Sequence, residues 1–177
     1  MSVKNFFPLA ALFIASGLTA QTPAISGTFV STLGSDTLQI ERFTRTRDKL
    51  EGDIVRRLPR VQVTHYVADL AGGRWKGMST TVRRYGADPA AAPNVSIVAL
   101  LADTTASLEV QRNGKADSAS SGNRSFKGRA AATVPGSPPS IGVYEQILAS
   151  NPPVGKDSVV VNLIGGAAAN NATLTLV

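Results

Sequence analysis

Apolar and polar residues alternate with a period of two along most of the chain after residue 24. The clearest run is residues 61–68. There, one strand face would carry Val61, Val63, His65 and Val67, and the other would carry Gln62, Thr64, Tyr66 and Ala68. This period is typical of a β-strand with two different faces. The same pattern or a β-prone composition predicts further strands over residues 25–33, 37–46, 50–57, 75–85, 95–101, 107–112, 126–134, 159–164 and 172–177.

Turn-forming residues separate these predicted strands. Residues 34–36, 69–73 and 113–114 combine glycine with Asn, Asp or Ser, as short hairpin connections do. Longer loops are predicted over residues 86–94 and 117–123, and a flexible connection over residues 165–169. Within residues 37–46 the apolar face changes between Ile40 and Phe43, which predicts a bulge or a strong twist.

One helix is predicted in the C-terminal part of the chain, over residues 141–150. Val143 and Ile147 have the i,i+4 spacing that places two side chains on one helix face. Ser140 precedes this run as a candidate N-cap, and prolines lie on both sides of it. The remaining elements are strands, so we expect a mainly β fold: an antiparallel curved sheet, either a half-barrel or a sandwich, with one short helix near 141–150.

The chain divides into a leader and one domain. Residues 1–20 have the layout of a signal peptide: Lys4 is positively charged, residues 6–15 are mostly apolar, and small residues precede a predicted cleavage after Ala20. The apolar stretch is shorter than the roughly 20 residues of a membrane-spanning helix, which favours cleavage over an anchor. Residues 21–177 suffice for a single β domain, whose last strand either ends the fold at Val177 or continues beyond it.

The leader predicts a location in the periplasm or outside the cell. The chain has no cysteine, which excludes disulfides and thiol chemistry in such an oxidising compartment. The formal net charge is +6, which either favours anionic partners or simply keeps the protein soluble. A candidate cationic face comprises Arg42, Arg45, Arg47, Arg56, Arg57, Arg60, Arg74, Arg83 and Arg84. Predicted export and few interleaved aromatic residues argue against nucleic acid as the partner.

Candidates for catalysis are few. His65 is the only histidine, so sites that need two imidazoles are excluded, and no metal or cofactor is predicted. On a strand, His65 and Asp69 would lie about 13 Å apart, too far to share a metal. His65 could serve as the base of a hydrolase, but no Gly-x-Ser-x-Gly motif selects a nucleophile. The neighbouring carboxylates are expected to form cross-strand ion pairs rather than a catalytic pair; they are Glu41, Asp48, Glu51 and Asp53.

Three segments carry a family resemblance: residues 36–43, residues 50–53 and the predicted hairpin 66–73. They resemble the opening strands of uncharacterised exported bacterial β-proteins, over residues 25–85. In outline such proteins are similar to the periplasmic half-barrels that carry outer-membrane lipoproteins. The resemblance implies a concave apolar face that holds a lipid-like ligand, and it carries no functional residue over to this chain.

The sequence therefore predicts an exported, non-enzymatic binding or carrier module for a hydrophobic ligand or an envelope component, with at most transient membrane contact. Its candidate ligand-binding residues are Phe43, Ile54, Val63, Trp75 and Met78. We expect them to line an apolar cavity between sheet and helix. The alternatives are a structural cell-envelope module without a small ligand and, least favoured, a hydrolase that uses His65.

Overall fold

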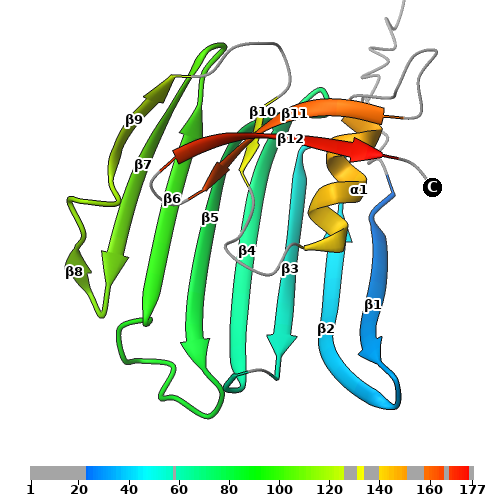
Figure 1. Ribbon diagram of the computed structural model, residues 1–177, viewed down its shortest axis with the longest axis vertical. Helices are drawn as coiled ribbons and strands as arrows, with labels where there is room; N and C mark the ends of the chain where they lie inside the picture. The colour runs from blue at the N-terminus through cyan, green and yellow to red at the C-terminus, as the bar shows by residue number, and fades with distance from the viewer. Residues whose placement is uncertain are drawn as a thin grey trace, which may run out of the picture.

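The computed structural model describes residues 23–57, 59–125, 131–133, 140–150, 158–165 and 168–175. Its main element is a nine-stranded antiparallel sheet that curves without closing on itself (Figure 1). The strands are β1 (Ile25–Leu33), β2 (Asp36–Arg45), β3 (Lys49–Arg56), β4 (Gln62–Ala71), β5 (Arg74–Arg84), β6 (Val95–Leu101), β7 (Thr105–Arg112), β8 (Lys115–Ala116) and β9 (Gly122–Ser125). From β1 to β8, neighbours along the chain are neighbours in the sheet, and β9 also pairs with β7.

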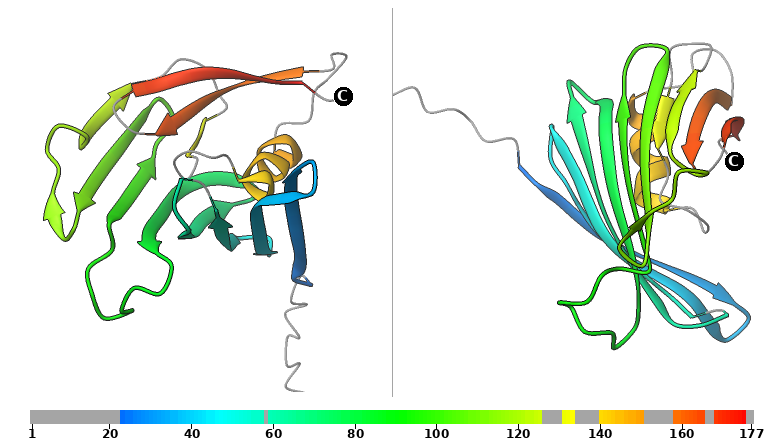
Figure 2. Two further views of the ribbon diagram at one scale, coloured as in Figure 1. Left: turned by 60° about the horizontal axis from the view of Figure 1, so that its bottom comes forward. Right: turned by 90° about the vertical axis from the view of Figure 1, so that its left-hand side faces the viewer.

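Two smaller elements lie on one side of this sheet (Figure 2). They are the helix α1 (Ile141–Ser150) and a three-stranded sheet of β10 (Ala131–Thr133), β11 (Ser158–Gly165) and β12 (Ala168–Thr175). β10 runs parallel to β11, whereas β11 and β12 are antiparallel. We call the side of the large sheet that carries α1 the inner face, and the opposite side the open face.

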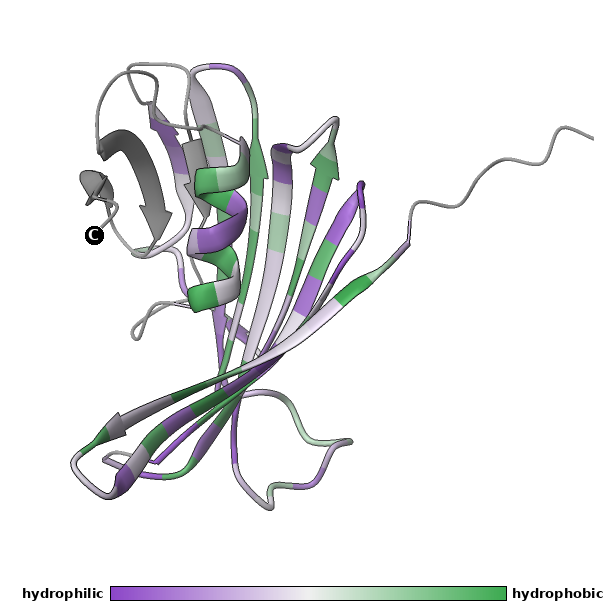
Figure 3. Ribbon diagram, turned by 90° about the vertical axis from the view of Figure 1, so that its right-hand side faces the viewer, coloured by the Kyte–Doolittle hydropathy of each residue, from purple (hydrophilic) through white to green (hydrophobic). Residues whose placement is uncertain are grey.

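The pleat of each strand divides its side chains between these two faces. In β2, Gln39, Glu41 and Phe43 are buried on the inner face, while Ile40 and Arg42 are exposed on the open face. Figure 3 shows the resulting alternation of apolar and polar positions along the strands. The strands are thus amphipathic, and one face of the sheet is free to carry polar side chains.

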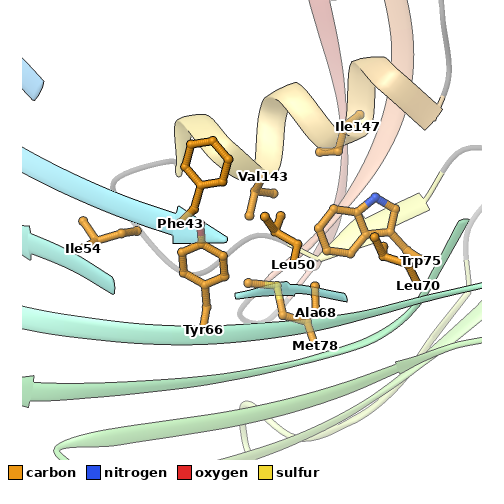
Figure 4. Packing of buried hydrophobic residues seen from close by; sticks show 10 residues of the cluster. All are labelled: Phe43, Leu50, Ile54, Tyr66, Ala68, Leu70, Trp75, Met78, Val143 and Ile147. Carbon is orange, nitrogen blue, oxygen red and sulfur yellow. The ribbon is translucent and has the colours of Figure 1, made fainter. Parts of the chain in front are cut away.

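The main core lies between α1 and strands β2 to β5 (Figure 4). Val143 and Ile147 of α1 have no exposed surface. They join one cluster with Phe43, Leu50, Ile54, Tyr66, Ala68, Leu70, Trp75 and Met78. Full burial of a large apolar side chain contributes about 1.5–3 kcal/mol, so this cluster is the main force that holds α1 on the sheet.

The predicted fold class is confirmed: the described chain is mainly β, with one curved antiparallel sheet and a single short helix. The helix spans Ile141–Ser150, the range that the apolar spacing predicts. The predicted Asn113-Gly114 hairpin is also present, and both residues have the positive φ (48° and 75°) that a tight turn between β7 and β8 requires.

Two predicted connections are partly wrong. β9 begins at Gly122, inside the predicted loop 117–123, and β12 begins at Ala168, inside the predicted connection 165–169. In both segments, small and polar side chains give no strand signal. Backbone pairing with β7 and β11 orders them instead, and sequence periodicity does not report such pairing.

The predicted irregularity in the second strand has a different position and cause. Ser31 pairs with Gln39 and Thr32 with Thr37, so one extra residue, Leu38, is inserted at the start of β2. Pairing with β3 is continuous from Gln39 onward. The change of apolar face between Ile40 and Phe43 is therefore not a bulge: Ile40 is an exposed apolar residue on the open face.

Some expectations concern parts of the chain outside the described residues. The predicted signal peptide, residues 1–20, is one of them. Of the predicted strand 126–134, the described part is β10, Ala131–Thr133. Within the described chain, no helix is long and apolar enough to cross a membrane.

Candidate binding groove on the open face

Side chains of β1 to β4 surround a groove of about 440 Å³ on the open face. Strand register explains why they meet. Thr28, Arg42, Asp53 and His65 are successive cross-strand partners on β1, β2, β3 and β4, so they form one row on the same face. The complete lining is Ser26, Gly27, Thr28, Arg42, Phe43, Thr44, Glu51, Gly52, Asp53 and His65.

The floor of the groove is backbone. Gly27, Phe43 and Gly52 are direct cross-strand neighbours, and the pleat directs their Cβ positions to the inner face. There, a Cβ on Gly27 would lie 2.6 Å from Cε1 of Phe43, and a Cβ on Gly52 would lie 2.5 Å from the hydroxyl oxygen of Tyr66. The two aromatic rings occupy the space that side chains at the glycines would need, which requires glycine at both positions.

Asp53 and His65 form a polar pair at one end of the groove. Oδ1 of Asp53 lies 2.9 Å from Nδ1 of His65 on the neighbouring strand, and both side chains are more than half exposed. The contact orients the imidazole through Nδ1. It leaves Nε2 available to a ligand, because no hydrogen bond engages that atom within the described chain.

The charges of the groove are only partly compensated. Lys49 Nζ lies 2.5 Å from Oε2 of Glu51, and this hydrogen bond lowers the pKa of the Glu51 carboxyl, so Glu51 is ionised at neutral pH. Arg42 is directly opposite Asp53, yet the Asp53 carboxylate contacts His65 instead. Among the described residues no ion pair engages Arg42, so its guanidinium is the uncompensated cation of the groove.

On the inner face, directly beside Arg42 in the chain, Glu41 is completely buried. Its carboxylate accepts four hydrogen bonds, from the Ile141 amide (2.7 Å), the Gly142 amide (3.2 Å), the Tyr66 hydroxyl (2.6 Å) and the Ser140 hydroxyl. A carboxylate at a helix N-terminus satisfies free amide groups and complements the helix dipole. Glu41 therefore fixes the start of α1 to β2, the strand whose open face carries Arg42.

Tyr66 completes this buried cluster as a neutral donor. Burial raises the pKa of its hydroxyl far above the usual range, and the hydrogen bond to Glu41 raises the pKa further. The hydroxyl is therefore protonated at neutral pH. Ser140 caps the helix as its sequence position predicts, because its Oγ accepts a hydrogen bond of 3.0 Å from the Val143 amide.

The five predicted ligand-lining residues do not share one surface. Phe43, Ile54, Trp75 and Met78 are buried in the core cluster, whereas Val63 is half-buried on the open face, opposite Arg83. The described side chains between α1 and β2 to β5 thus pack together where we expected an apolar cavity. The hydrophobic ligand stays a prediction, without a cavity in this part of the described structure.

The surroundings of His65 do not assemble a hydrolytic triad from the described residues. Its carboxylate partner is Asp53 and not Asp69. The hydroxyl of Thr28 is on β1, three strands from β4, which corresponds to about 14 Å at the usual strand spacing. Thr81, opposite His65 on β5, makes no hydrogen bond with it. The described chain also contains no group of three or more His, Cys, Asp or Glu side chains that could hold a metal ion.

The predicted cationic face is divided between both sides of the sheet. Arg42 lies on the open face, as does Arg83, the partner of Val63. Arg56 follows Ile54 by two residues on β3 and therefore lies on the inner face. Its Nη2 donates a hydrogen bond of 3.1 Å to Oε1 of Gln62. A single arginine-rich surface is therefore not formed by these three residues, and Arg42 alone belongs to the groove.

The predicted cross-strand ion pairs take another form. Asp53 pairs with the histidine of the next strand, and Glu51 pairs with a lysine of its own strand. Glu41 serves as the helix anchor. Its position carried a usable signal, because Glu41 has the same phase as the apolar Phe43 two residues later and therefore belongs to the buried face. The groove hydroxyls of Ser26, Thr28 and Thr44 carried no such signal, since hydroxyl residues are ordinary on open strand faces.

Comparisons with protein-family models, curated proteins and solved structures found no match to this chain. The resemblance of residues 25–85 to exported bacterial β-proteins therefore stays a prediction. The case for a function rests on the groove and its chemistry.

Proposed function

We propose that this chain is a non-catalytic binding module that holds an acidic, hydroxyl-rich ligand, such as a segment of an acidic polysaccharide, in the open-face groove. The observation that carries the proposal is the exposed Arg42 guanidinium, which has no ion-pair partner among the described residues although the groove also contains Glu51 and Asp53. An uncompensated guanidinium is suited to bind a carboxylate or phosphate through two parallel hydrogen bonds.

The other groups of the groove favour a ligand that carries hydroxyls as well as negative charge. Asp53 and Glu51 accept hydrogen bonds, and they repel a densely charged polyanion. The hydroxyls of Ser26 and Thr44 lie 3.0 Å apart and can both donate and accept. A sugar acid satisfies all these groups at once, because its carboxylate meets Arg42 while its hydroxyls meet the carboxylates of the groove.

The scaffold also supports binding rather than catalysis. The groove lies on four paired strands whose opposite face is fixed to α1 through Glu41, and sites on such rigid elements hold their side chains in place. Asp53 holds His65 by one ring nitrogen, and no hydroxyl of the described chain is hydrogen-bonded to the imidazole as a nucleophile would be. The predicted signal peptide would bring this groove to the compartment in which envelope polysaccharides occur.

Isothermal titration calorimetry with trigalacturonic acid tests the proposal, and maltotriose is the neutral probe of similar size. We expect measurable binding of the acidic sugar and much weaker binding of the neutral one. Arg42→Ala should lower the affinity about tenfold, because a charge-assisted hydrogen bond contributes about 1.5 kcal/mol or more. The affinity of Arg42→Lys should fall between those of the wild type and Arg42→Ala, since lysine keeps the charge and loses the planar fork.

Arg60→Ala is the matched control, because it removes the same charge from an exposed residue that does not line the groove. It should leave the affinity unchanged within about twofold, as expected for screened charges at a distance. If Arg42→Ala and Arg60→Ala lose affinity equally, the net charge alone accounts for binding, and the role assigned to Arg42 is contradicted. Equal binding of the two sugars would remove the role assigned to Arg42.

A further inference from the structure

β1 is an open edge of the nine-stranded sheet. It pairs with β2 on one side and has no strand on the other among the described residues (Figure 1). Its nine residues contain no charged side chain and no proline, and Figure 3 shows it without the strongly hydrophilic positions of its neighbours. Ile25, Val30 and Leu33 are 54%, 56% and 72% exposed. Proteins normally protect such an edge with charge, proline, a bulge or a short strand, because it can pair with another chain.

The opposite edge of the same sheet is protected. It consists of β8, with two residues, and β9, with four, and both are short. Each carries a positive charge, Lys115 on β8 and Arg124 on β9. The short length and the charge that protect this edge are absent from β1, and the extra residue Leu38 in its pairing lies on β2, at the far end of the strand. This difference between the two edges indicates that the edge of β1 is used.

The sequence of β1 is complementary to itself in the antiparallel direction. If two copies pair across a two-fold axis at Phe29, each position meets a residue of similar character. The pairs are Ile25 with Leu33, Ser26 with Thr32, Gly27 with Ser31, Thr28 with Val30, and Phe29 with its own counterpart. Large apolar residues thus meet each other at the ends, small residues meet near the middle, and no charge meets a like charge.

We propose that β1 is a docking surface for a second copy of this chain, through antiparallel β1–β1 pairing about a two-fold axis at Phe29. Such pairing joins the two nine-stranded sheets into one and removes both open edges. An interface of this kind is isologous, so the same strand serves both copies. The self-complementary order of residues favours a copy of this chain over an unrelated strand.

The pairing would also extend the groove. Ser26 and Thr28 of the groove lie on β1, and the two-fold arrangement places the partner's Thr32 opposite Ser26 and the partner's Val30 opposite Thr28. The two grooves then lie on one continuous open face. The pairing does not depend on the proposed ligand, since it rests on the edge strand alone.

Sedimentation velocity over a concentration series tests the pairing in the full chain. We expect a species of twice the chain mass that dissociates on dilution. Val30→Lys places a charge on the exposed side of β1 and should make the protein monomeric. Val98→Lys is the matched control, because Val98 is also exposed but lies on the central strand β6; it should stay dimeric. A wild-type monomer throughout, or a dimer in Val30→Lys, would overturn the proposal.

The register has its own test. In a sample mixed from ¹³C-labelled and unlabelled protein, a filtered NOE spectrum reports contacts between copies only. We expect an NOE between the methyl groups of Val30 and of the partner's Thr28, since opposite side chains on one face have Cβ atoms about 5 Å apart. A dimer that lacks this NOE would contradict the axis at Phe29.

Discussion

The amide of Ile141, at the start of α1, donates a hydrogen bond of 2.7 Å to Oε2 of Glu41 on β2. The two residues are 100 positions apart in the chain, and Glu41 has no exposed surface. A buried carboxylate is costly unless hydrogen bonds replace its water. Here three further donors complete its shell, so this single side chain determines where the helix begins on the sheet.

We expect Glu41→Gln to lower the free energy of unfolding by about 2–4 kcal/mol, because its amide group would direct hydrogens at donors and leave one or more of them unsatisfied. Urea unfolding can be followed by the fluorescence of Trp75, the one tryptophan of the chain, which is buried in the core. Glu109→Gln is the matched control on an exposed position of β7, with an expected change below about 0.5 kcal/mol. Similar small effects at both sites would contradict the anchoring role of Glu41.

Tyr66 predicts a dependence of stability on alkaline pH. Its folded-state pKa is raised, mainly by burial, above the unfolded value of about 10. The stabilisation from the neutral hydroxyl is therefore fully present below about pH 10 and is lost as the pH rises beyond it, because the unfolded state then releases the proton more readily. Unfolding free energies on both sides of this pH measure the loss.

Tyr66→Phe should show a smaller alkaline loss than the wild type, and at neutral pH it should be less stable by about 1–2 kcal/mol, since Glu41 loses a donor. Tyr85→Phe is the control, because Tyr85 is 71% exposed; its alkaline behaviour should match the wild type. If Tyr66→Phe loses as much stability at alkaline pH as the wild type, a group other than Tyr66 causes the loss, which would contradict this prediction.

Gly52 occupies a position where the Tyr66 hydroxyl and the Arg42 carbonyl leave no room for a side chain. A Cβ at this position would lie 2.5 Å from the Tyr66 hydroxyl oxygen and 2.6 Å from the carbonyl oxygen of Arg42. We therefore expect Gly52→Ala to destabilise the protein by about 2–3 kcal/mol through overpacking. The comparison is Gly34→Ala at a hairpin tip, where nothing lies within 4 Å and only the positive φ of 60° is strained; its cost should be about 1 kcal/mol. Thermal unfolding of the two variants separates these causes, and a larger loss in Gly34→Ala would contradict the packing at Gly52.

The local elements of this fold could be predicted from the sequence because their signals are local. The period of two gives the strands, and Ser140, Val143 and Ile147 give the helix with its cap. The role of Glu41 was missed because its donors on α1 are about 100 residues away. The phase that Glu41 shares with Phe43 indicates burial, but the strand alone does not reveal the donors that the carboxylate meets.

The groove shows the same limit. Arg42, Asp53 and His65 each stand out in the sequence, but their meeting depends on the register of two strand pairs, β2–β3 and β3–β4, which composition does not encode. His65 was therefore considered with Asp69 on its own strand, whereas its partner is on the neighbouring strand. Register also explains why the predicted lining residue Val63 lies on the face opposite to Phe43 and Ile54.

The most direct test of the proposed function is a ¹H–¹⁵N chemical-shift titration of the full chain with trigalacturonic acid. The account predicts saturable shifts that concentrate on the amides of β1 to β4 around Gly27, Arg42, Gly52 and His65, and that need about tenfold more ligand to reach saturation in Arg42→Ala. Shifts confined to the inner face near α1, or spread over all arginines alike, would contradict it.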